Sequence, residues 1–511
     1  MKSRQIAKLL VPVIAVCAVV FGLGPAASAA EACDPPAPMP VPASGTVVGD
    51  GSAQSCTAGA LASAVARGGH VTFACGGAAV TIPVTTTISV TRTTVIDGGG
   101  TVTLAGGGAN RILQVPNGTS LSVRNLRFVK GAAAQSANRD IGAGGAIAGG
   151  YKSHVEVVSS SFENNTAGLG GGAVYVGTGS SLSIVGSTFQ GNSSWYGGAV
   201  YSLLSQLEVI DSTFTGNSTT TGGGMGEGGA IGTDGASMIA AGGRGGEIRV
   251  CGSTFTGNTG HGSGGGVYLW AYVPDRIIVE RDAFKGNAIK PNDSGSVGLG
   301  GGARLSIGPT QYAASGGSVT VDGTSVVSNS GGDGGGLYVD CLPSCTITNS
   351  TFYGNSATAF GGAIMGDGHH DDNDTFAENE AGDHGGALWG NKIEISNSVF
   401  AGNAAHNPWG QAMACGATAT GSHVVQWLTS GRDRSTPCVA QAIAADPLLG
   451  PPAANGGSTL TMMPAANSPV LNAGAGCEPV DQRGAARSVS RCDVGAVQRG
   501  ALAPASPTQA G

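Results

Sequence analysis

The chain has 511 residues, of which 91 are glycine and only 11% are charged, and its formal net charge is −7. This composition leaves little room for long helices, and the negative charge argues against nucleic acid as a partner. Beyond the N-terminal leader no apolar run approaches the length that crosses a bilayer, so we expect no membrane partner once the leader is removed.

The N-terminus has the three parts of a secretory signal. Lys2, Arg4 and Lys8 form the positive region, residues 9–23 the apolar core and residues 27–29 a small-residue cleavage site. Cleavage removes three cationic residues and takes the formal charge to −10. We expect the mature chain to be secreted, with association at the cell surface left open.

Two segments separate this signal from the repeats. Residues 30–44 are rich in proline and predict an extended leader. Within residues 45–130 an amphipathic pattern at Thr57–Ala66, with Leu61 and Val65 on one side, predicts a short helix. We expect this helix to cap the first coil of the repeats that follow.

Residues 131–403 repeat one unit. Its phrase Phe-x-x-Asn recurs at steps of 24–29 residues with two longer steps of 41 and 42, and each unit carries a Gly-Gly phrase such as Gly171-Gly172. A base period near 24–27 residues with occasional insertions is typical of a solenoid. We expect the insertions Thr219–Glu247 and Ala288–Ser318 to leave the coil as loops. The repeated position holds Phe162, Phe189, Phe214, Phe255, Phe284, Val326, Phe352, Phe376 and Phe400.

Each unit predicts one coil of a parallel β-helix with three short strands. Coils stacked about 4.8 Å apart place Phe189 over Phe214 in the core and Asn192 over Asn217 at a turn, where their amides can bond one another. The paired glycines suit a turn with positive φ. We therefore predict an all-β, right-handed, single-stranded parallel β-helix with an N-terminal cap, the hand following from the crossover preference of parallel strands.

Alignment on the Gly-Gly phrase predicts an aromatic face. Positions two residues apart on a strand share one face of a sheet, and equivalent positions of successive coils lie in register. Rings on such a face can stack on sugar rings, although tyrosine and tryptophan are also ordinary residues for a half-exposed strand. The candidate polysaccharide-binding residues are Tyr175, Tyr201, Tyr268, Trp270, Tyr338 and Trp389.

An acidic stretch at residues 367–374 replaces the apolar strand found in other coils. Carboxylates suit Ca²⁺ and imidazoles suit transition metals, so a metal site is one expectation and a solvated charged loop is the other. The candidate metal ligands are His369, His370, Asp371 and Asp372.

Three further charged residues are candidates for catalysis. Asp340 and Asp367 should lie one coil apart on the outer face, with Lys392 beside them. Lyases of this kind of fold need a base beside carboxylates, and glycosidases need a pair or trio of carboxyl groups. The patch therefore suits either chemistry.

Ten cysteines remain after the signal is removed, an even number in an exported chain. Their scattered positions favour disulfides over a zinc site. Cys33 and Cys251 are left over, either to pair or to stay free. The predicted pairs are Cys56–Cys75, Cys341–Cys345, Cys415–Cys438 and Cys477–Cys492.

Residues 404–500 predict the terminal coils and a region with a family resemblance. The phrases Asp446-Pro-Leu-Leu-Gly, Asn467-Ser-Pro-Val-Leu-Asn-Ala-Gly, Asp481-Gln-Arg-Gly and Cys492-Asp-Val-Gly-Ala-Val occur in this order. Together they resemble the C-terminal region of bacterial choice-of-anchor Q proteins. That resemblance implies an extracellular right-handed β-helix of the pectate-lyase-like superfold, and no agreed activity. Residues 501–511 predict a disordered tail without an anchor.

Two functions remain open from the sequence. The first is a secreted, monomeric, adhesin-like β-helix that binds extracellular polysaccharide or a cell-surface glycan. The second is a polysaccharide lyase or glycoside hydrolase, with Ca²⁺ as the cofactor to expect. The low charge content favours the first, since most coils offer no outward titratable group.

Overall fold

The computed structural model describes residues 33–504 except 137, 222–225, 239–244, 310–315, 409–412, 417–418, 428–436 and 489. The predicted signal at residues 1–29 and most of the predicted tail lie outside the described residues. Within the described ranges, no helix has the length and apolar character of a membrane span.

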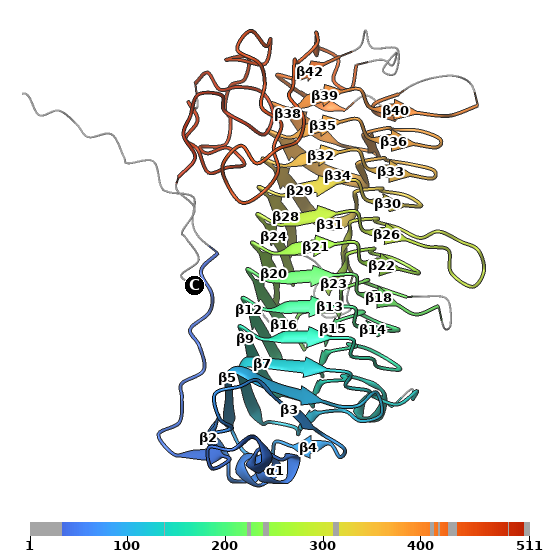
Figure 1. Ribbon diagram of the computed structural model, residues 1–511. Helices are drawn as coiled ribbons and strands as arrows, with labels where there is room; N and C mark the ends of the chain where they lie inside the picture. Colours follow the sequence, from blue (N-terminus) through green and yellow to red (C-terminus); the bar gives the residue numbers. More distant parts are fainter. Residues whose placement is uncertain are drawn as a thin grey trace, which may run out of the picture.

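The chain winds into a stack of coils, each of which adds one strand to every sheet (Figure 1). All pairings between named strands are parallel, which confirms the predicted parallel β-helix. Three long sheets surround the core, and a short fourth row lies at one corner.

Sheet 1 follows the Gly-Gly phrase of each coil. Its members are β4 (Ile88–Ser89), β6 (Leu113–Val115), β8 (Ile147–Gly149), β11 (Val174–Val176), β15 (Val200–Leu203), β19 (Ile231–Asp234), β23 (Val267–Tyr272), β27 (Ala303–Gly308), the first parts of β31 (Leu337–Thr348) and β34 (Ile364–Asp372), and β37 (Leu388–Trp389).

Sheet 2 comes next in each coil. It contains β1 (Gly45–Val48), β2 (Gly69–Phe73), the first parts of β5 (Thr94–Ala105) and β7 (Ser120–Val129), β9 (His154–Val158), β12 (Ser181–Val185), β16 (Gln206–Ile210), β20 (Glu247–Cys251), β24 (Arg276–Glu280), β28 (Ser318–Asp322), the second parts of β31 and β34, β38 (Glu394–Ser396) and β41 (Thr420–Ser422).

Sheet 3 carries the phenylalanine position. It contains β3 (Val80–Pro83), the second parts of β5 and β7, β10 (Ser161–Glu163), β13 (Thr188–Gln190), β17 (Thr213–Thr215), β21 (Thr254–Thr256), β25 (Ala283–Lys285), β29 (Ser325–Val327), β32 (Thr351–Tyr353), β35 (Thr375–Ala377), β39 (Val399–Ala401), β42 (Val425–Gln426) and β43 (Ile443–Ala444).

The short row closes each coil behind the asparagine turn. Its strands are β14 (Ser193–Ser194), β18 (Ser218–Thr219), β22 (Thr259–Gly260), β26 (Ala288–Ile289), β30 (Ser330–Gly331), β33 (Ser356–Ala357), β36 (Glu380–Ala381) and β40 (Ala404–Ala405).

The phenylalanines form one buried column, as the repeat predicts. Phe162, Phe189 and Phe214 are direct register partners, and stacked ring centroids along the column lie 4.7–5.0 Å apart. Val326 is the position at which an aliphatic side chain replaces a ring. Because burial of each such ring contributes about 1.5–3 kcal/mol, this column is a major part of the apolar core.

The Gly-Gly turn requires glycine for two different reasons. Gly171 has a φ of +60°, which L side chains rarely adopt, and a Cβ there would lie 2.1 Å from Val174 O. Gly172 packs so closely on the next coil that a Cβ would lie 2.3 Å from Gly198 O. The phrase therefore marks a turn at which successive backbones touch.

Each predicted insertion contains a strand of sheet 1. The stretch Thr219–Glu247 includes β19, and Ala288–Ser318 includes β27. The expectation of one long loop in each is therefore wrong, because the Gly-Gly phrases at Gly228 and Gly300 return the chain to the coil between shorter excursions.

A short helix caps the N-terminal end of the stack of coils. Helix α1 (Ala58–Arg67) begins at Thr57, whose side chain accepts a hydrogen bond from Ala60 N, and it buries Leu61 and Val65 against the open end of the stack (Figure 1). This confirms the predicted capping helix. Two other short helices are η1 (Ala53–Ser55) and α2 (Arg139–Gly142).

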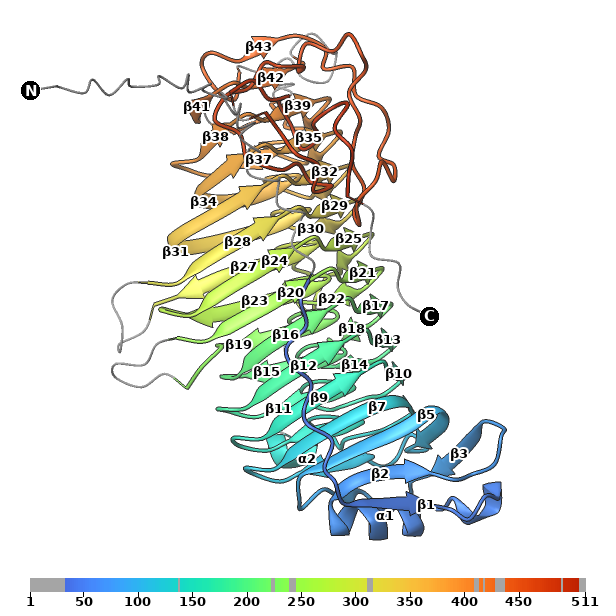
Figure 2. The same ribbon diagram turned by 90° about the vertical axis from the view of Figure 1, so that its left-hand side faces the viewer.

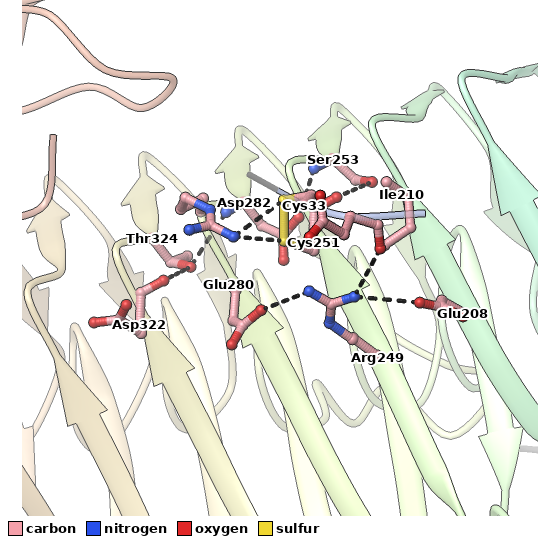
Figure 3. Close-up of a disulfide and its surroundings, with 12 residues drawn as sticks. Cys33, Glu208, Ile210, Arg249, Cys251, Ser253, Glu280, Asp282, Asp322 and Thr324 are labelled. Carbon is pink, nitrogen blue, oxygen red and sulfur yellow. Dashed lines mark hydrogen bonds and ion pairs between the residues drawn. A yellow bond between two sulfur atoms is a disulfide. The ribbon is translucent and has the colours of Figure 1, made fainter. Parts of the chain in front are cut away.

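Residues 33–44, here called the strap, run along the outside of sheet 2 (Figure 2). Cys33 at its start is joined to Cys251 of β20 by a disulfide, so the two cysteines left over in the sequence pair with each other (Figure 3). Arg249 donates to Asp34 O, and Met39 N donates to the buried Glu156 at 2.8 Å. The four predicted disulfides are also present.

Residues 446–504 fold back over the last coils as an irregular layer (Figure 1). Val470 and Val494 pack on Val399 and Val425 of sheet 3. Asp481 and Arg483 form a salt bridge, with Nη2 and Oδ2 2.7 Å apart and both side chains buried. The layer thereby covers the outer face of sheet 3 near the end of the stack.

Candidate functional site

The outer face of sheet 1 carries the aromatic column in the predicted register. Tyr201 pairs with Gly232, which pairs with Tyr268. From β8 to β37 the column reads Ala148, Tyr175, Tyr201, Gly232, Tyr268, Arg304, Tyr338, Met365 and Trp389.

The rings are packed more tightly than a solvent-facing stripe would be. Tyr175 and Tyr201 are each 5% exposed and Tyr268 is 8% exposed. Tyr196, from the turn before the Gly-Gly phrase, stacks on Tyr201 with centroids 5.4 Å apart. The expectation of an exposed stripe is therefore wrong for these rings, and in the case of Tyr201 the covering residue, Tyr196, lies in a turn outside the aligned column.

The column also divides into separate groups. Tyr175 and Tyr201 belong to one apolar cluster. Trp389 packs on Phe360 at 5.0 Å, near the end of the stack. Between them, the guanidinium of Arg304 lies 5.3 Å from the ring centroids of both Tyr268 and Tyr338. The aromatic side chains of sheet 1 therefore form separate local clusters and not the continuous surface that an extended polysaccharide would need.

A pocket opens where Gly232 interrupts the tyrosine column. With no side chain at this position, the rings of Tyr201 and Tyr268 stand two coils apart, about 9.6 Å between their strands. The hollow has a volume of about 220 Å³. Its lining residues are Tyr196, Tyr201, Glu227, Thr233, Asp234, Tyr268, Trp270 and Tyr272.

Two carboxyl groups line this pocket. Glu227 lies just before the Gly-Gly turn, and Asp234 ends β19. Burial raises the pKa of Glu227 to about 7, with Arg304 opposing the rise and Asp234 adding to it. The hydroxyl of Tyr272 donates to Asp234 Oδ1 at 2.7 Å. The pocket therefore combines an acid that titrates near neutrality with an oriented hydrogen-bond acceptor.

Two tyrosines of the pocket, Tyr268 and Tyr272, remain protonated over the physiological range. Burial raises the pKa of Tyr272 to about 12, and its hydrogen bond to Asp234 adds to the rise. Burial also raises the pKa of Tyr268, as does the nearby Glu227. Both hydroxyls therefore act as neutral donors.

The predicted catalytic patch lies on open surface. Asp340 and Asp367 are register partners one coil apart, as expected, and both are exposed. Asp367 Oδ1 accepts a hydrogen bond from Asn391 N at 2.7 Å, and Lys392 is exposed nearby in sequence. These residues share a face with the pocket but do not line it.

The four predicted metal ligands lie on opposite sides of β34. His369 and Asp371 point into the core, where the neighbouring strand has Cys345 and Ile347, and their Nδ1 and Oδ1 atoms are 2.9 Å apart. His370 faces outward toward Glu394. Across the described residues no three His, Cys, Asp or Glu side chains converge as a metal site requires.

The alternation of a strand explains this division. The stretch predicted as an exposed charged loop or metal site forms part of sheet 2, so every second residue enters the core. Asp372 lies on the outer side and accepts a hydrogen bond from Asn397 Nδ2 at 2.9 Å. The four side chains therefore do not act as one ligand set.

The sequence contained a signal for the pocket that the aligned columns did not use. Glu227 occupies the position before the Gly-Gly phrase, where Tyr196 and Ser263 are its neighbours in adjacent coils. The signal is Gly232, a glycine between tyrosines in the aligned column, with two acidic residues, Glu227 and Asp234, in the same coil. Asp234 lies two residues after Gly232, at the position that Asp340 occupies relative to Tyr338, and its sequence surroundings alone do not distinguish it from Asp340.

The fold and this pocket define a parallel β-helix protein with an aromatic pocket on one sheet. Residues 159–177 and 349–367 match the Chlamydia polymorphic membrane protein repeat. No match was found among curated proteins.

Two solved structures resemble the chain at low identity. The catalytic unit of a thermostable GH87 alpha-1,3-glucanase from Streptomyces thermodiastaticus strain HF3-3 is 15% identical, with a TM-score of 0.36, over 77% of this chain and 67% of that one. PfbA, a surface adhesin of Streptococcus pneumoniae, is 12% identical, with a TM-score of 0.32, over 75% and 93%. These likenesses concern the fold alone.

Proposed function

We propose that this protein is an extracellular β-helix that binds carbohydrate through the pocket at Gly232. The observation that carries the proposal is the missing ring between Tyr201 and Tyr268, which leaves a hollow with aromatic walls and carboxylate acceptors. Sugars present apolar C–H faces that stack on rings and hydroxyls that donate to carboxylates.

The size of the pocket favours a short ligand. Its volume of about 220 Å³ is below the range of about 300–1,000 Å³ common for drug-sized ligands. One sugar residue, or the end of a glycan chain, suits this space better than an extended segment. The carboxyl groups of Glu227 and Asp234 disfavour acidic sugars, so the ligand class is a neutral glycan.

An extracellular location agrees with the covalent chemistry of the chain. Ten cysteines form five disulfides, and such bonds persist in oxidising compartments. The predicted secretory signal and the resemblance of the C-terminal region to choice-of-anchor Q proteins support the same location. We propose that the mature protein acts outside the cell.

The test is retention of the mature protein on immobilised neutral glycans. Gly232→Tyr adds the missing ring. Its Cβ would meet Gly197 N at 3.0 Å, Glu227 O at 3.1 Å and Tyr201 Cδ2 at 3.2 Å, so these neighbours must move by a few tenths of an ångström. Retention should be abolished. Trp270→Ala should weaken it by about 2 kcal/mol, or roughly 30-fold, as expected for a central aromatic contact.

Gly177→Tyr is the matched control, since it adds the same ring to the same face outside the pocket with its nearest contact at 3.3 Å. It should retain glycan like the wild type, and equal melting temperatures should show that all variants fold. Unchanged retention by a folded Gly232→Tyr variant would refute the proposed site.

A further inference from the structure

We propose that the same pocket hydrolyses glycosides, with Glu227 as general acid and Asp234 as the carboxylate that accepts a proton from the attacking water. This inference rests on the proposed carbohydrate binding but goes beyond it. It assigns catalysis to two residues inside the aromatic pocket rather than to the open patch at Asp340 and Asp367.

The placement of the two carboxyl groups supports this assignment. The backbone carbonyl of Glu227 lies against Gly232, since a Cβ on that glycine would be 3.1 Å from it. Asp234 follows Gly232 by two residues on β19, so it points to the same outer face about 7 Å further along the strand. Glu227 and Asp234 both line the hollow, and the charge of Asp234 acts on the carboxyl group of Glu227.

The two carboxyl groups also have different surroundings. Glu227 is largely withdrawn from water, and this burial raises its pKa to about 7, so a large share stays protonated at neutral pH. Asp234 accepts the hydroxyl proton of Tyr272 in a hydrogen bond, which orients it. Two carboxyl groups held in unlike environments are the arrangement that acid–base catalysis of glycoside cleavage uses.

The neighbouring rings bind and position the sugar. Tyr268 and Trp270 stack at 6.2 Å on one strand, and Trp270 meets Tyr272 edge to face at 6.2 Å. Arg304 lies behind Tyr268, with its guanidinium 5.3 Å from that ring, and its Nη1 donates to Ser263 Oγ. The positive charge of Arg304 opposes the rise in the pKa of Glu227.

The step balances with water as the only co-reactant. The bond between the anomeric carbon and the glycosidic oxygen breaks, and its electron pair stays with that oxygen, which takes the proton of Glu227. The water oxygen bonds to the anomeric carbon and gives its proton to Asp234. Proton exchange with solvent then restores both carboxyl groups.

The experiment compares two kinds of probe on the purified mature chain. The first is a panel of 4-nitrophenyl α- and β-glycosides of glucose, galactose, mannose and N-acetylglucosamine. The second is the corresponding disaccharides, whose leaving groups need a proton. Glu227→Gln should lower disaccharide turnover about 10²–10⁴-fold but affect nitrophenyl glycosides much less, since nitrophenolate leaves unprotonated.

Three further results are expected. Asp234→Asn should lower turnover of both kinds of probe. The wild-type kcat/KM for disaccharides should fall at alkaline pH with an apparent pKa of about 7, and Glu227→Gln should lose this fall. Asp293→Asn, which removes an exposed carboxylate that does not line the pocket, should match the wild type.

Two results would overturn the inference. In the first, the wild-type protein cleaves none of the probes but still binds glycan, and Gly232→Tyr abolishes that binding. This result would refute catalysis and leave the proposed binding function standing. The other is cleavage that persists undiminished in both Glu227→Gln and Asp234→Asn. If the wild-type protein and all variants neither bind glycan nor cleave any probe, the proposed binding function itself is refuted.

Discussion

Asp282 occupies a position where most other coils have serine or threonine. Along this row each backbone N–H donates to the side chain of the next coil, so Ser253 N donates to Asp282 Oδ1 at 2.6 Å (Figure 3). Burial raises the pKa of Asp282 well above its ordinary range. Its Oδ2 atom has no hydrogen-bond partner among the described residues. The row comprises Ser160, Ser187, Ser212, Ser253, Asp282, Thr324, Ser350, Asp374 and Ser398.

Asp282→Ser should therefore stabilise the protein at neutral and alkaline pH by about 1–3 kcal/mol, the usual cost of an unsatisfied buried polar group. Because the folded pKa lies above the ordinary value of 3.8, the folded state binds more protons. The wild-type free energy of unfolding then falls as pH rises from about 4 through the folded pKa. Melting temperatures from pH 4 to 9 measure this fall.

The variant should lose the part of the fall that belongs to Asp282, while Asp293→Asn, at an exposed carboxylate, should keep it. An Asp282→Ser protein with the wild-type pH dependence would show that this carboxyl does not determine it. Serine is a fitting replacement because Ser212 N makes the same contact to Ser253 Oγ at 3.1 Å.

Among the structural elements, the asparagine turn is held by buried polar contacts that repeat from coil to coil. Asn217 Oδ1 accepts from the backbone N and the Nδ2 of Asn192, and its own Nδ2 donates to Phe189 O and to Asn258 Oδ1. These four distances are 2.9–3.0 Å. The same pattern recurs along Asn165, Asn192, Asn217, Asn258, Asn287, Asn329, Asn355, Asn379 and Asn403.

Asn217→Ala should destabilise the protein by about 3–5 kcal/mol, since at least two buried backbone groups lose their partners at about 1–3 kcal/mol each. Thermal unfolding measures the loss. Gln190→Ala is the control, because it truncates an amide side chain that is exposed on β13. Equal melting temperatures for the two variants would contradict the structural role of the asparagine row.

The register of these strands could be predicted from the sequence, because equivalent positions of successive repeats pair with one another. Phe189 over Phe214 and Asn192 over Asn217 follow from equal positions in successive units. Side-chain exposure on sheet 1 could not be predicted in this way. The cover over Tyr201 comes from Tyr196, a turn residue whose direction depends on the fold.

The pocket was missed for a related reason. In the sequence Gly232 is one of many glycines in a Gly-rich stretch. Only the fold shows that it lies between Tyr201 and Tyr268 and leaves a gap between their rings. The inward direction of His369 was missed because a run of charged residues suggests a loop, whereas register with Cys345 places it in a strand.

At the scale of the whole molecule, the strap ties two distant parts of the stack together. The Cys33–Cys251 disulfide spans 218 residues of sequence and fixes the strap across β9, β12 and β16 (Figure 2). Met39 N donates to Glu156, and Arg124 donates to Met39 O. The coils between the cap and β20 are thus held by a connection outside the sheets.

The double variant Cys33→Ser, Cys251→Ser should lower the free energy of unfolding by about 4–5 kcal/mol, because closing so long a loop removes much entropy from the unfolded chain. The pair Cys415→Ser, Cys438→Ser is the comparison, since its separation of 23 residues predicts a loss of about 3 kcal/mol. Denaturant titration of both measures the difference. A larger loss from the shorter loop would contradict this ranking.

The asparagine row has a direction along the axis of the solenoid. Between neighbouring asparagines, each Nδ2 donates to the side-chain oxygen of the next coil toward the C-terminus, while its second proton goes to a backbone carbonyl of the preceding coil. Aligned amide dipoles add, as they do in a helix. The two ends of the row consequently differ in hydrogen bonding: the first side-chain oxygen accepts from Gly131 N at 2.7 Å, whereas the last amide, that of Asn403, donates to Phe376 O at 2.9 Å. Any chain that extended the stack would have to match the polarity of the end it joined.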